Sequence, residues 1–374
     1  MTNTQSQPQR LLSLDILRGF DLFMLVFFQP VLGALGRKID SPMMNSILYH
    51  FNHEEWVGFR AWDLVMPLFL FMAGVAIPFA LSKYRNGGDK IKMYKRILRR
   101  VILLFILGAI VQGNLLGLDI HKFYPYSNTL QAIAVGYLIT AVLVMNFSIK
   151  GQLIGAGILM LLYWIPMTFL GDFTPEGNFA EAVDQFVLER FRDGTTWNPG
   201  NDSWSPNPHY HYTWILSSLT FGVTTLMGAF AGHIVKNGTN RNKNALTLLV
   251  IGVACIAVSL IWSLQMPIIK KIWTCTMVLY SGGICFLLLA LFYYIIDCRN
   301  YSKGLMWLKV YGMNSITAYV IGMTVDFGSV VSSVSYGLEQ FFNEYYSVWI
   351  TFGNFMIVFI ILKIMYDRGI FLKV

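Results

Sequence analysis

Long uninterrupted runs of apolar residues constrain this chain more than any other feature of its sequence. The hydrocarbon core of a bilayer is about 30 Å thick and needs about 20 apolar residues for each spanning helix. Only 13% of the 374 residues are charged. We therefore expect a polytopic membrane protein with about ten spanning helices, near residues 12–35, 61–82, 98–114, 127–147, 151–171, 213–235, 245–264, 273–296, 305–326 and 345–366.

The secondary structure of these runs follows from the chemistry of the backbone. In lipid a chain must satisfy its own backbone hydrogen bonds, which only helices and closed barrels do. The runs lack the alternation of polar and apolar residues that barrel strands show, so we expect an all-α bundle. No strong internal repeat divides the chain, and we expect one transmembrane domain over residues 1–374. Segment 172–212 is expected to form an outer loop that caps a cavity.

Lysine and arginine gather in alternate loops. Segment 83–100 carries eight of these residues, and loops 236–243 and 297–303 are also basic. Because positively charged loops stay in the cytoplasm, we expect both termini to be cytoplasmic and the first helix to be an uncleaved membrane helix. Topology and anionic lipid headgroups then account for the net charge of +8, and we expect membrane lipids rather than nucleic acid as partners.

Cysteine and histidine give no sign of a metal site or a disulfide framework. The four cysteines lie in expected helices or at a cytoplasmic end and lack the paired short spacings of a zinc site. His209 and His211 could ligate a metal, but no further ligand stands at a supporting spacing. We expect no metal and regard these histidines as candidates for acceptor binding.

Charged and amide side chains on the first helix are costly to place in lipid without a role. Asp15, Arg18 and Asp21 follow one another at steps of three residues, so Arg18 can neighbour both acids on one helix. This cluster is either a structural ion-pair group at the inner mouth or part of a donor site. Gln29 lies near the outer end of the same helix, where an amide either ties helices together or contacts the reaction.

A histidine precedes the second apolar run, in the stretch HEEWVGFRAWDLVMPLFLFMAGV that begins at His53. Histidine can take and return a proton near neutral pH, and a carboxylate such as Asp63, ten residues later, can orient it. A structural histidine and a helix-start aspartate are the alternatives. Glu54 and Glu55 are expected to be solvated at the membrane interface.

Five segments in order along the chain carry a resemblance to a known family. They are RLLSLDILRGFDLFMLVFF, HEEWVGFRAWDLVMPLFLFMAG, TLQAIAVGYLITAVL, KKIWTCTMVLYSGG and GMNSITAY. Together they resemble the heparan-α-glucosaminide N-acetyltransferase family and its bacterial relatives over nearly the whole chain. The resemblance implies a membrane acyltransferase of the bacterial inner membrane, which acetylates a sugar amine or hydroxyl outside with acetyl-CoA from the cytoplasm. The family's catalytic histidine falls on His53.

The resemblance also suggests residues for each substrate. The phosphates of CoA would contact Arg18, Arg99 and Arg100 on the cationic inner face, with Asp15 beside Arg18. His53 would either deprotonate the acceptor or attack the thioester itself, and Gln29 or Asn314 could stabilise the oxyanion. The remaining candidates are Gln131 for the donor and Trp56, His211 and Asn314 for the acceptor.

The sequence departs from the family pattern at three places. Gln29 stands where the family has a catalytic asparagine late in the first helix. Pro125 and Ala132 replace the arginines that flank the family's GVLQR motif, of which Gln131 remains. His211-Tyr-Thr-Trp replaces an Asp-Pro-Glu-Gly stretch before the sixth span. These departures affect the expected donor contacts and the identity of the acceptor.

Two other classes of protein fit parts of the same pattern. A proton-coupled transporter or flippase for a sugar or glycolipid also needs titratable residues between helices, but the sequence has no inverted repeat and does carry the five family segments. A purely structural membrane protein would leave His53 without a role. The oligomeric state is not fixed by the sequence, and a homodimer is one option left open.

Overall fold

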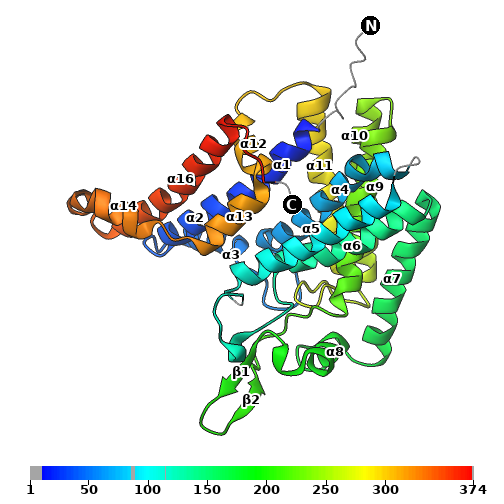
Figure 1. The fold of residues 1–374 in the computed structure, drawn as a ribbon, viewed down its shortest axis with the longest axis horizontal. Coiled ribbons are helices and arrows are strands. Elements are labelled where there is room, and N and C mark those ends of the chain that lie inside the picture. Colours follow the sequence, from blue (N-terminus) through cyan, green and yellow to red (C-terminus); the bar gives the residue numbers. More distant parts are fainter. Residues whose placement is uncertain (1–10, 86–88, 114, 373–374) are drawn as a thin grey trace.

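A computed structural model describes residues 11–85, 89–113 and 115–372 of the chain. The N-terminal stretch 1–10, which we expect in the cytoplasm, lies outside these residues. The elements, drawn in Figure 1, are α1 Leu12–Phe23, α2 Gln29–Gly36, α3 Pro42–His50, α4 Val65–Arg85, α5 Lys90–Val111, α6 Thr129–Asn146, α7 Ile149–Phe169, α8 Phe179–Leu188, β1 Thr195–Asn198, β2 Ser203–Pro206, α9 Ser217–Asn237, α10 Arg241–Trp262, α11 Cys275–Tyr293, α12 Met306–Met313, α13 Ser315–Thr324, α14 Gly328–Ser335, α15 Glu339–Phe342 and α16 Tyr346–Asp367.

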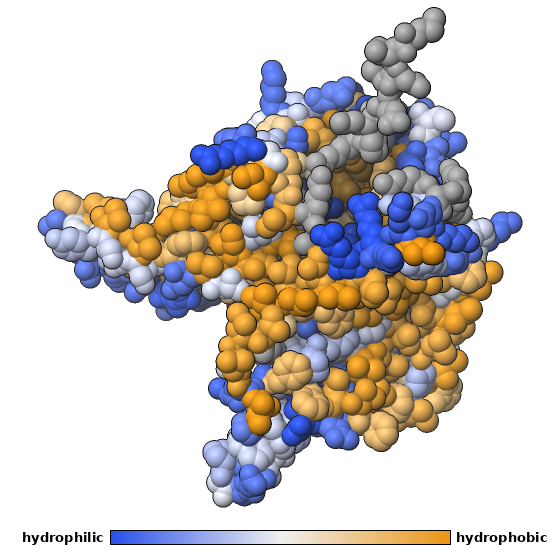
Figure 2. All heavy atoms as spheres, in the orientation of Figure 1, coloured by the Kyte–Doolittle hydropathy of each residue, from blue (hydrophilic) through white to orange (hydrophobic). Residues whose placement is uncertain are grey.

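The predicted all-α fold class is confirmed, with one small β-hairpin as the exception among the described residues. Figure 2 shows that apolar side chains cover most of the visible face, whereas hydrophilic ones gather toward the ends, including the β1–β2 hairpin. Within the described part, eight helical segments are long and apolar enough to cross a membrane: Leu12–Gly36, Ala61–Leu81, Thr129–Asn146, Ile149–Phe169, Ser217–Asn237, Arg241–Trp262, Cys275–Cys298 and Gly328–Asp367.

Two of the ten expected spans differ from the structure. The span expected at 98–114 is the second half of α5, whose first half carries Lys95 and Arg96 and is too charged to match the eight apolar segments. The span expected at 305–326 is two short helices, α12 and α13. Asn314 separates them because its backbone, with φ −119° and ψ 43°, is not helical.

Some segments expected as loops contain helices. Loop 36–60 includes α3, the outer loop 172–212 includes α8 and the β1–β2 hairpin, and segment 327–344 includes α14 and α15. The first span is helical throughout but contains a π-helical turn at Met24–Phe28. Such turns widen a helix locally and are frequent at functional sites. All four cysteines are free thiols in the structure.

Helix α4 lies at the centre of the bundle and packs on α9, α6, α11 and α1. Its contact with α9 is close because glycines stand at the crossing. A β-carbon on Gly74 would lie 1.8 Å from the Thr225 carbonyl oxygen, and one on Gly228 would lie 1.9 Å from the Phe71 carbonyl oxygen. Small residues let two backbones approach in this way in membrane bundles. This contact fixes the position of α4, whose first residues follow His53 and Asp63.

The α4–α9 crossing gives a test of the packing. We expect Gly228→Ala to lower the thermal unfolding temperature in detergent by several degrees, because overpacking a tight contact typically costs about 1–3 kcal/mol. Gly157→Ala on α7 is the matched control, since a β-carbon there meets no atom within 4 Å. Equal unfolding temperatures for the two variants would contradict the close α4–α9 contact.

Candidate active site

His53 and Asp63 lie side by side at the start of α4. The His53 Nδ1 atom is 2.8 Å from Asp63 Oδ1. The histidine side chain is 42% exposed, whereas the aspartate is fully buried. A carboxylate only accepts hydrogen bonds, so Nδ1 carries the proton of this contact, and in a neutral imidazole Nε2 would then be the acceptor. The pair has the geometry of a base whose tautomer is held by an acid.

The second carboxylate oxygen of Asp63 organises the chain before α4. Asp63 Oδ2 accepts hydrogen bonds from the backbone N–H groups of Glu54, at 3.2 Å, and Arg60, at 3.0 Å. The Arg60 guanidinium in turn binds the Glu54 carboxylate through two contacts of 2.9 Å. The loop that carries His53 is therefore folded around one buried acid. This pairing with Arg60 lowers the pKa of Glu54, which is more enclosed than the solvated position expected for it.

Lys270 is a third charged group at this point, and the sequence analysis did not select it. Its Nζ atom lies 2.8 Å from His53 Nδ1, 3.3 Å from His53 Nε2 and 3.3 Å from Asp63 Oδ1. The side chain is only 8% exposed. Burial lowers the pKa of Lys270 to about 8, although Asp63 favours its charged form.

The loop between α10 and α11 carries Lys270 and is fixed on several sides. Gly58 donates its backbone N–H to the Ile268 carbonyl at 2.9 Å, and its φ of +131° suits glycine. The Ile272 carbonyl accepts the hydroxyls of Tyr163, at 2.6 Å, and Ser217, at 3.0 Å. These bonds place Lys270 against His53 although 217 residues separate them in the sequence.

His53 and Lys270 line a cavity of about 380 Å³. We call it the outer cavity because it lies on the side that we expect to face away from the cytoplasm. Its polar lining includes Asn128 and Asp193, and Leu25 reaches it from the π-helical turn. Eight aromatic side chains form much of its remaining wall: Trp62, Phe69, Tyr210, Tyr212, Trp214, Phe221, Trp273 and Tyr319. A concave site with aromatic walls and a few polar groups is typical of a small-molecule site.

A second cavity, of about 280 Å³, lies on the side of the bundle where α5 begins. Three arginines line it, Arg18, Arg96 and Arg100. Arg18 Nη1 is 3.8 Å from Asp15 Oδ1, and the Arg100 guanidinium lies 4.2 Å from the centre of the Tyr137 ring. The structure thus gathers two of the three predicted donor arginines in one cationic cavity.

The two cavities share part of their lining. Phe69, Thr129 and Tyr319 line both. The rings of Phe69 and Tyr319 meet edge to face, with their centres 6.5 Å apart. These three side chains therefore belong to the wall between the cationic cavity and the cavity that contains His53.

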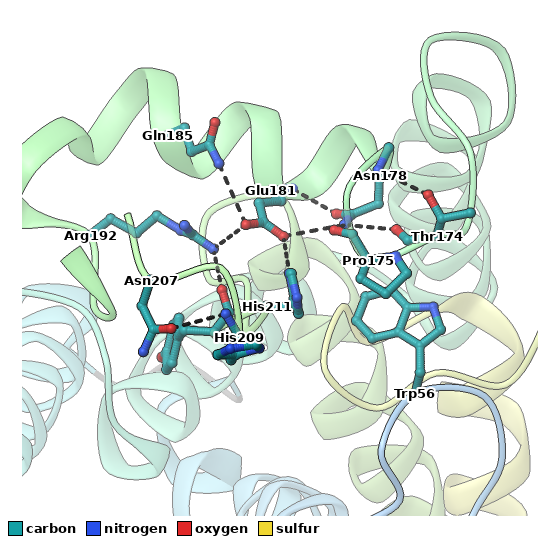
Figure 3. Close-up of polar contacts among 12 residues, drawn as sticks. Trp56, Thr174, Pro175, Asn178, Glu181, Gln185, Arg192, Asn207, His209 and His211 are labelled. Atoms are coloured by element: carbon teal, nitrogen blue, oxygen red, sulfur yellow. Dashed lines mark hydrogen bonds and ion pairs between the residues drawn. The ribbon is translucent and has the colours of Figure 1, made fainter. Parts of the chain in front are cut away.

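Trp56 and His211 come together, but in a cap beside the outer cavity rather than in its lining (Figure 3). Their ring centres are 5.7 Å apart. His211 Nδ1 is 3.0 Å from Glu181 Oε2, and the same carboxylate binds the buried Arg192 at 2.7 Å. Tyr210 and Tyr212 line the cavity, whereas His211 between them turns to Glu181. His209 is exposed.

Two amides predicted to contact substrates serve other parts of the fold. Gln131 accepts the backbone N–H groups of Ser127 and Asn128, at 2.8 and 3.1 Å, and its amide donates to the Pro125 carbonyl at 3.0 Å. It therefore caps α6. Asn314 donates to the Ile370 carbonyl at 3.0 Å and accepts from the Leu372 N–H at 3.2 Å, which fastens the tail beside the cationic cavity.

Gln29 and Arg99 also lie away from the lining of these cavities. Gln29 is one helical turn beyond Leu25 and is only partly buried. On α5, Arg96 and Arg100 are four residues apart, share a face and line the cationic cavity, whereas Arg99 lines neither cavity. Among the described residues, no group of three His, Cys, Asp or Glu side chains could hold a metal ion.

One signal in the sequence could have pointed to Lys270. The pair Lys270-Lys271 precedes an apolar run on the side where we expect few cations. A lysine pair in a loop where the topology predicts few cations indicates that a neighbouring group in the fold holds the charge. Arg96 lacked a signal of its own, because it is one of eight basic residues in its segment.

These features define the class: a polytopic all-α membrane protein in which a histidine, an acid and a lysine meet at an aromatic cavity next to a cationic one. Comparison of the sequence with family models and with curated proteins shows which family the chain resembles. Residues 10–177 match the family model described as heparan-alpha-glucosaminide N-acetyltransferase, catalytic. This match includes His53 and Asp63 but not Lys270. The resemblance predicted from the sequence is confirmed.

Two curated relatives extend the similarity beyond that region. The human heparan-alpha-glucosaminide N-acetyltransferase is 23% identical in an alignment of 373 positions. This alignment covers 84% of this chain and 52% of the human protein. The mouse protein of the same name is 23% identical in an alignment of 368 positions, which covers 84% of this chain and 54% of the mouse protein. The chain spans about half the length of the curated relatives it matches.

The lowered pKa of Lys270 gives a test of its burial. Between about pH 8 and the unfolded value of about 10.5, the unfolded chain keeps a proton that the folded chain has lost. The unfolded state then binds more protons, so this residue makes the free energy of unfolding rise with pH across that window. Lys270→Met should lack this increment when thermal unfolding in detergent is compared with the native chain at each pH. Parallel curves across the window would contradict the buried position.

Proposed function

We propose that this protein is a membrane-embedded acetyltransferase, with acetyl-CoA from the cytoplasm as donor and a sugar amine or hydroxyl on the outer side as acceptor. The observation that carries this proposal is the shared wall between the cationic cavity and the cavity of His53. A donor with anionic phosphates can bind on one side while its acyl group reaches the base on the other. The bacterial inner membrane is the setting that we propose.

The cationic cavity suits the phosphates of CoA. Arg18, Arg96 and Arg100 offer charge-assisted hydrogen bonds that favour phosphate oxygens. The pantetheine arm is a long, thin chain, and a path past Phe69 and Tyr319 would lead it toward His53. Both side chains belong to each lining, so we propose that movement of these two rings opens the path between the cavities.

The outer cavity suits a sugar acceptor. Aromatic walls such as Trp62, Tyr212 and Trp273 can pack against the apolar face of a sugar ring, while Asn128 and Asp193 can bind its polar groups. The human and mouse relatives are named for N-acetyl transfer to a glucosaminide. We propose an acceptor of this class, an amino sugar or a glycan that ends in one.

His53 would supply the proton chemistry of the transfer. In the direct route, Nε2 removes a proton from the acceptor as the acceptor attacks the thioester carbonyl. The C–S bond then breaks, and the CoA sulfur takes the proton back from His53. In the two-step route, Nε2 attacks the thioester, releases CoA and passes the acetyl group from an acetyl-imidazole to the acceptor. Asp63 would orient the imidazole in both routes.

A transporter or flippase could also use two cavities that meet at a gated wall. That function needs no cleavage of a thioester, so release of free CoA thiol separates it from acetyl transfer. Uptake of a sugar by proteoliposomes without thiol release would favour transport and exclude the enzyme.

The central test is His53→Ala. We expect this variant to bind acetyl-CoA as well as the native protein does, because His53 lines the outer cavity and not the cationic one. Transfer of radiolabelled acetyl to amino sugars should fall by about 10²–10⁴-fold, the usual contribution of a positioned acid–base group. His50→Ala is the control, since this neighbouring histidine is exposed at the end of α3. Full transfer by His53→Ala would remove the residue from the mechanism.

The donor assignment has its own test. The double substitution Arg96→Gln and Arg100→Gln should weaken CoA binding by about tenfold or more, because hydrogen bonds to charged groups are each worth about 1.5–3 kcal/mol. The loss should shrink as salt is raised, since salt screens the native contacts. Arg99→Gln is the matched control, as it removes an exposed charge from the same helix. Equal CoA affinity in the double and control variants would move the donor site elsewhere.

A further inference from the structure

The position of Lys270 over the His53 ring is unusual for a simple hydrogen bond. A donor on the Nδ1 lone pair, in the plane of the ring, would lie much farther from Nε2 than from Nδ1. Here the two distances are similar, 2.8 and 3.3 Å. The ammonium group therefore lies over the face of the imidazole, and the in-plane Nδ1 position belongs to Asp63.

The three groups together carry a defined charge. An ammonium group only donates hydrogen bonds and a carboxylate only accepts them. His53 Nδ1 thus donates to Asp63 Oδ1 at 2.8 Å, and the Lys270 ammonium group forms an ion pair with the same oxygen at 3.3 Å. With His53 neutral, the single negative charge of Asp63 balances the single positive charge of Lys270. A second positive charge on the imidazole would lie about 3 Å from the ammonium group, where like charges repel strongly in a partly buried site.

We propose that Lys270 is a positioning residue that holds His53 in the neutral form, with Nδ1 protonated toward Asp63 and Nε2 free toward the outer cavity. A cation over the face of a neutral ring is attracted by it, whereas a cation over an imidazolium is repelled. The catalytic consequence rests on the proposed function: His53 would be ready to accept a proton or attack a thioester, and would return a proton readily to the departing sulfur. The charge arrangement itself does not depend on that function.

The other titratable groups around the site have their own partners. Glu54 is bound to Arg60 on the His53 loop. On the segment before α9, the Tyr210 hydroxyl donates to Asp193 at 2.5 Å. Lys271 lies 5.9 Å from the centre of the Tyr212 ring. Of these cavity and loop charges, Lys270 and Asp63 are the two that touch the imidazole.

The chemical state of His53 can be measured without any acetyl transfer. Diethyl pyrocarbonate acylates unprotonated imidazole nitrogen, and peptide mass spectrometry separates His53 from the other five histidines. The rate of modification of His53 would be followed from about pH 5 to about pH 8, the range in which histidine titrates. We expect Lys270→Met to move the acidic limb of this profile upward by about one pH unit, which is about a tenfold slower reaction at a fixed acidic pH.

Two further variants separate charge from structure. Lys270→Arg keeps a cation and its donors, and should restore the native profile. Lys271→Met removes the neighbouring cation and should leave the profile of His53 unchanged. A Lys270→Met protein that unfolds as cooperatively as the native chain but has the native profile would overturn the proposal, as would an equal displacement by Lys271→Met. If Lys270→Met does not fold, a native-like profile in Lys270→Gln would overturn it equally.

The acetyl-transfer assay on the same variants distinguishes the two proposals. If the native protein transfers no acetyl group but Lys270→Met still displaces the modification profile, the proposed function fails and the role of Lys270 stands. If transfer is present, the acidic limb of its pH–rate profile should move in the same direction in Lys270→Met and return in Lys270→Arg. If acetyl transfer is present but its pH–rate profile is the same in the native protein, Lys270→Met and Lys270→Arg, the proposed role of Lys270 is wrong and the proposed function stands.

Discussion

The buried carboxylate of Asp63 makes the interactions on which the site around His53 depends. It binds four donors: the backbone N–H groups of Glu54 and Arg60, the His53 imidazole and the Lys270 ammonium group. A fully buried acid is costly unless hydrogen bonds and a countercharge compensate it. Because the donors come from the loop before α4 and from the loop between α10 and α11, one acid joins two distant parts of the chain at the site.

The helix packing decides where this acid lies relative to the cationic cavity. Helix α4 is fixed against α9 through Gly74 and Gly228, at distances that no larger side chain would allow. Phe69 lies on α4 between the two ends and faces Tyr319 from α13. Helix α4 thus begins two residues after the acid and carries one residue of the wall that both cavities share.

Much of the fold and part of the site could be predicted from the sequence. The apolar runs predicted an all-α membrane bundle, and the order of the five motifs predicted the family resemblance. The pairing of His53 with Asp63 was foreseeable because a short loop joins them. Gln131 and Asn314 show the limit, since an amide that caps a helix and an amide that binds a substrate look the same in sequence. Only the donors and acceptors around each one, which come from the folded chain, distinguish them.

The sequence by itself determined that this chain folds as helices in a lipid bilayer. Its apolar runs are long enough to span the bilayer, and helices satisfy their own backbone hydrogen bonds there. It also determined that titratable groups would stand at the ends of those helices. The tertiary structure alone decided which of these groups meet. Lys270 reaches His53 across 217 residues, Arg96 rather than Arg99 enters the cationic cavity, and His211 turns to Glu181. The reason is geometric: helix rotation and loop direction set where a side chain points, and both are fixed by packing against neighbours rather than by local composition.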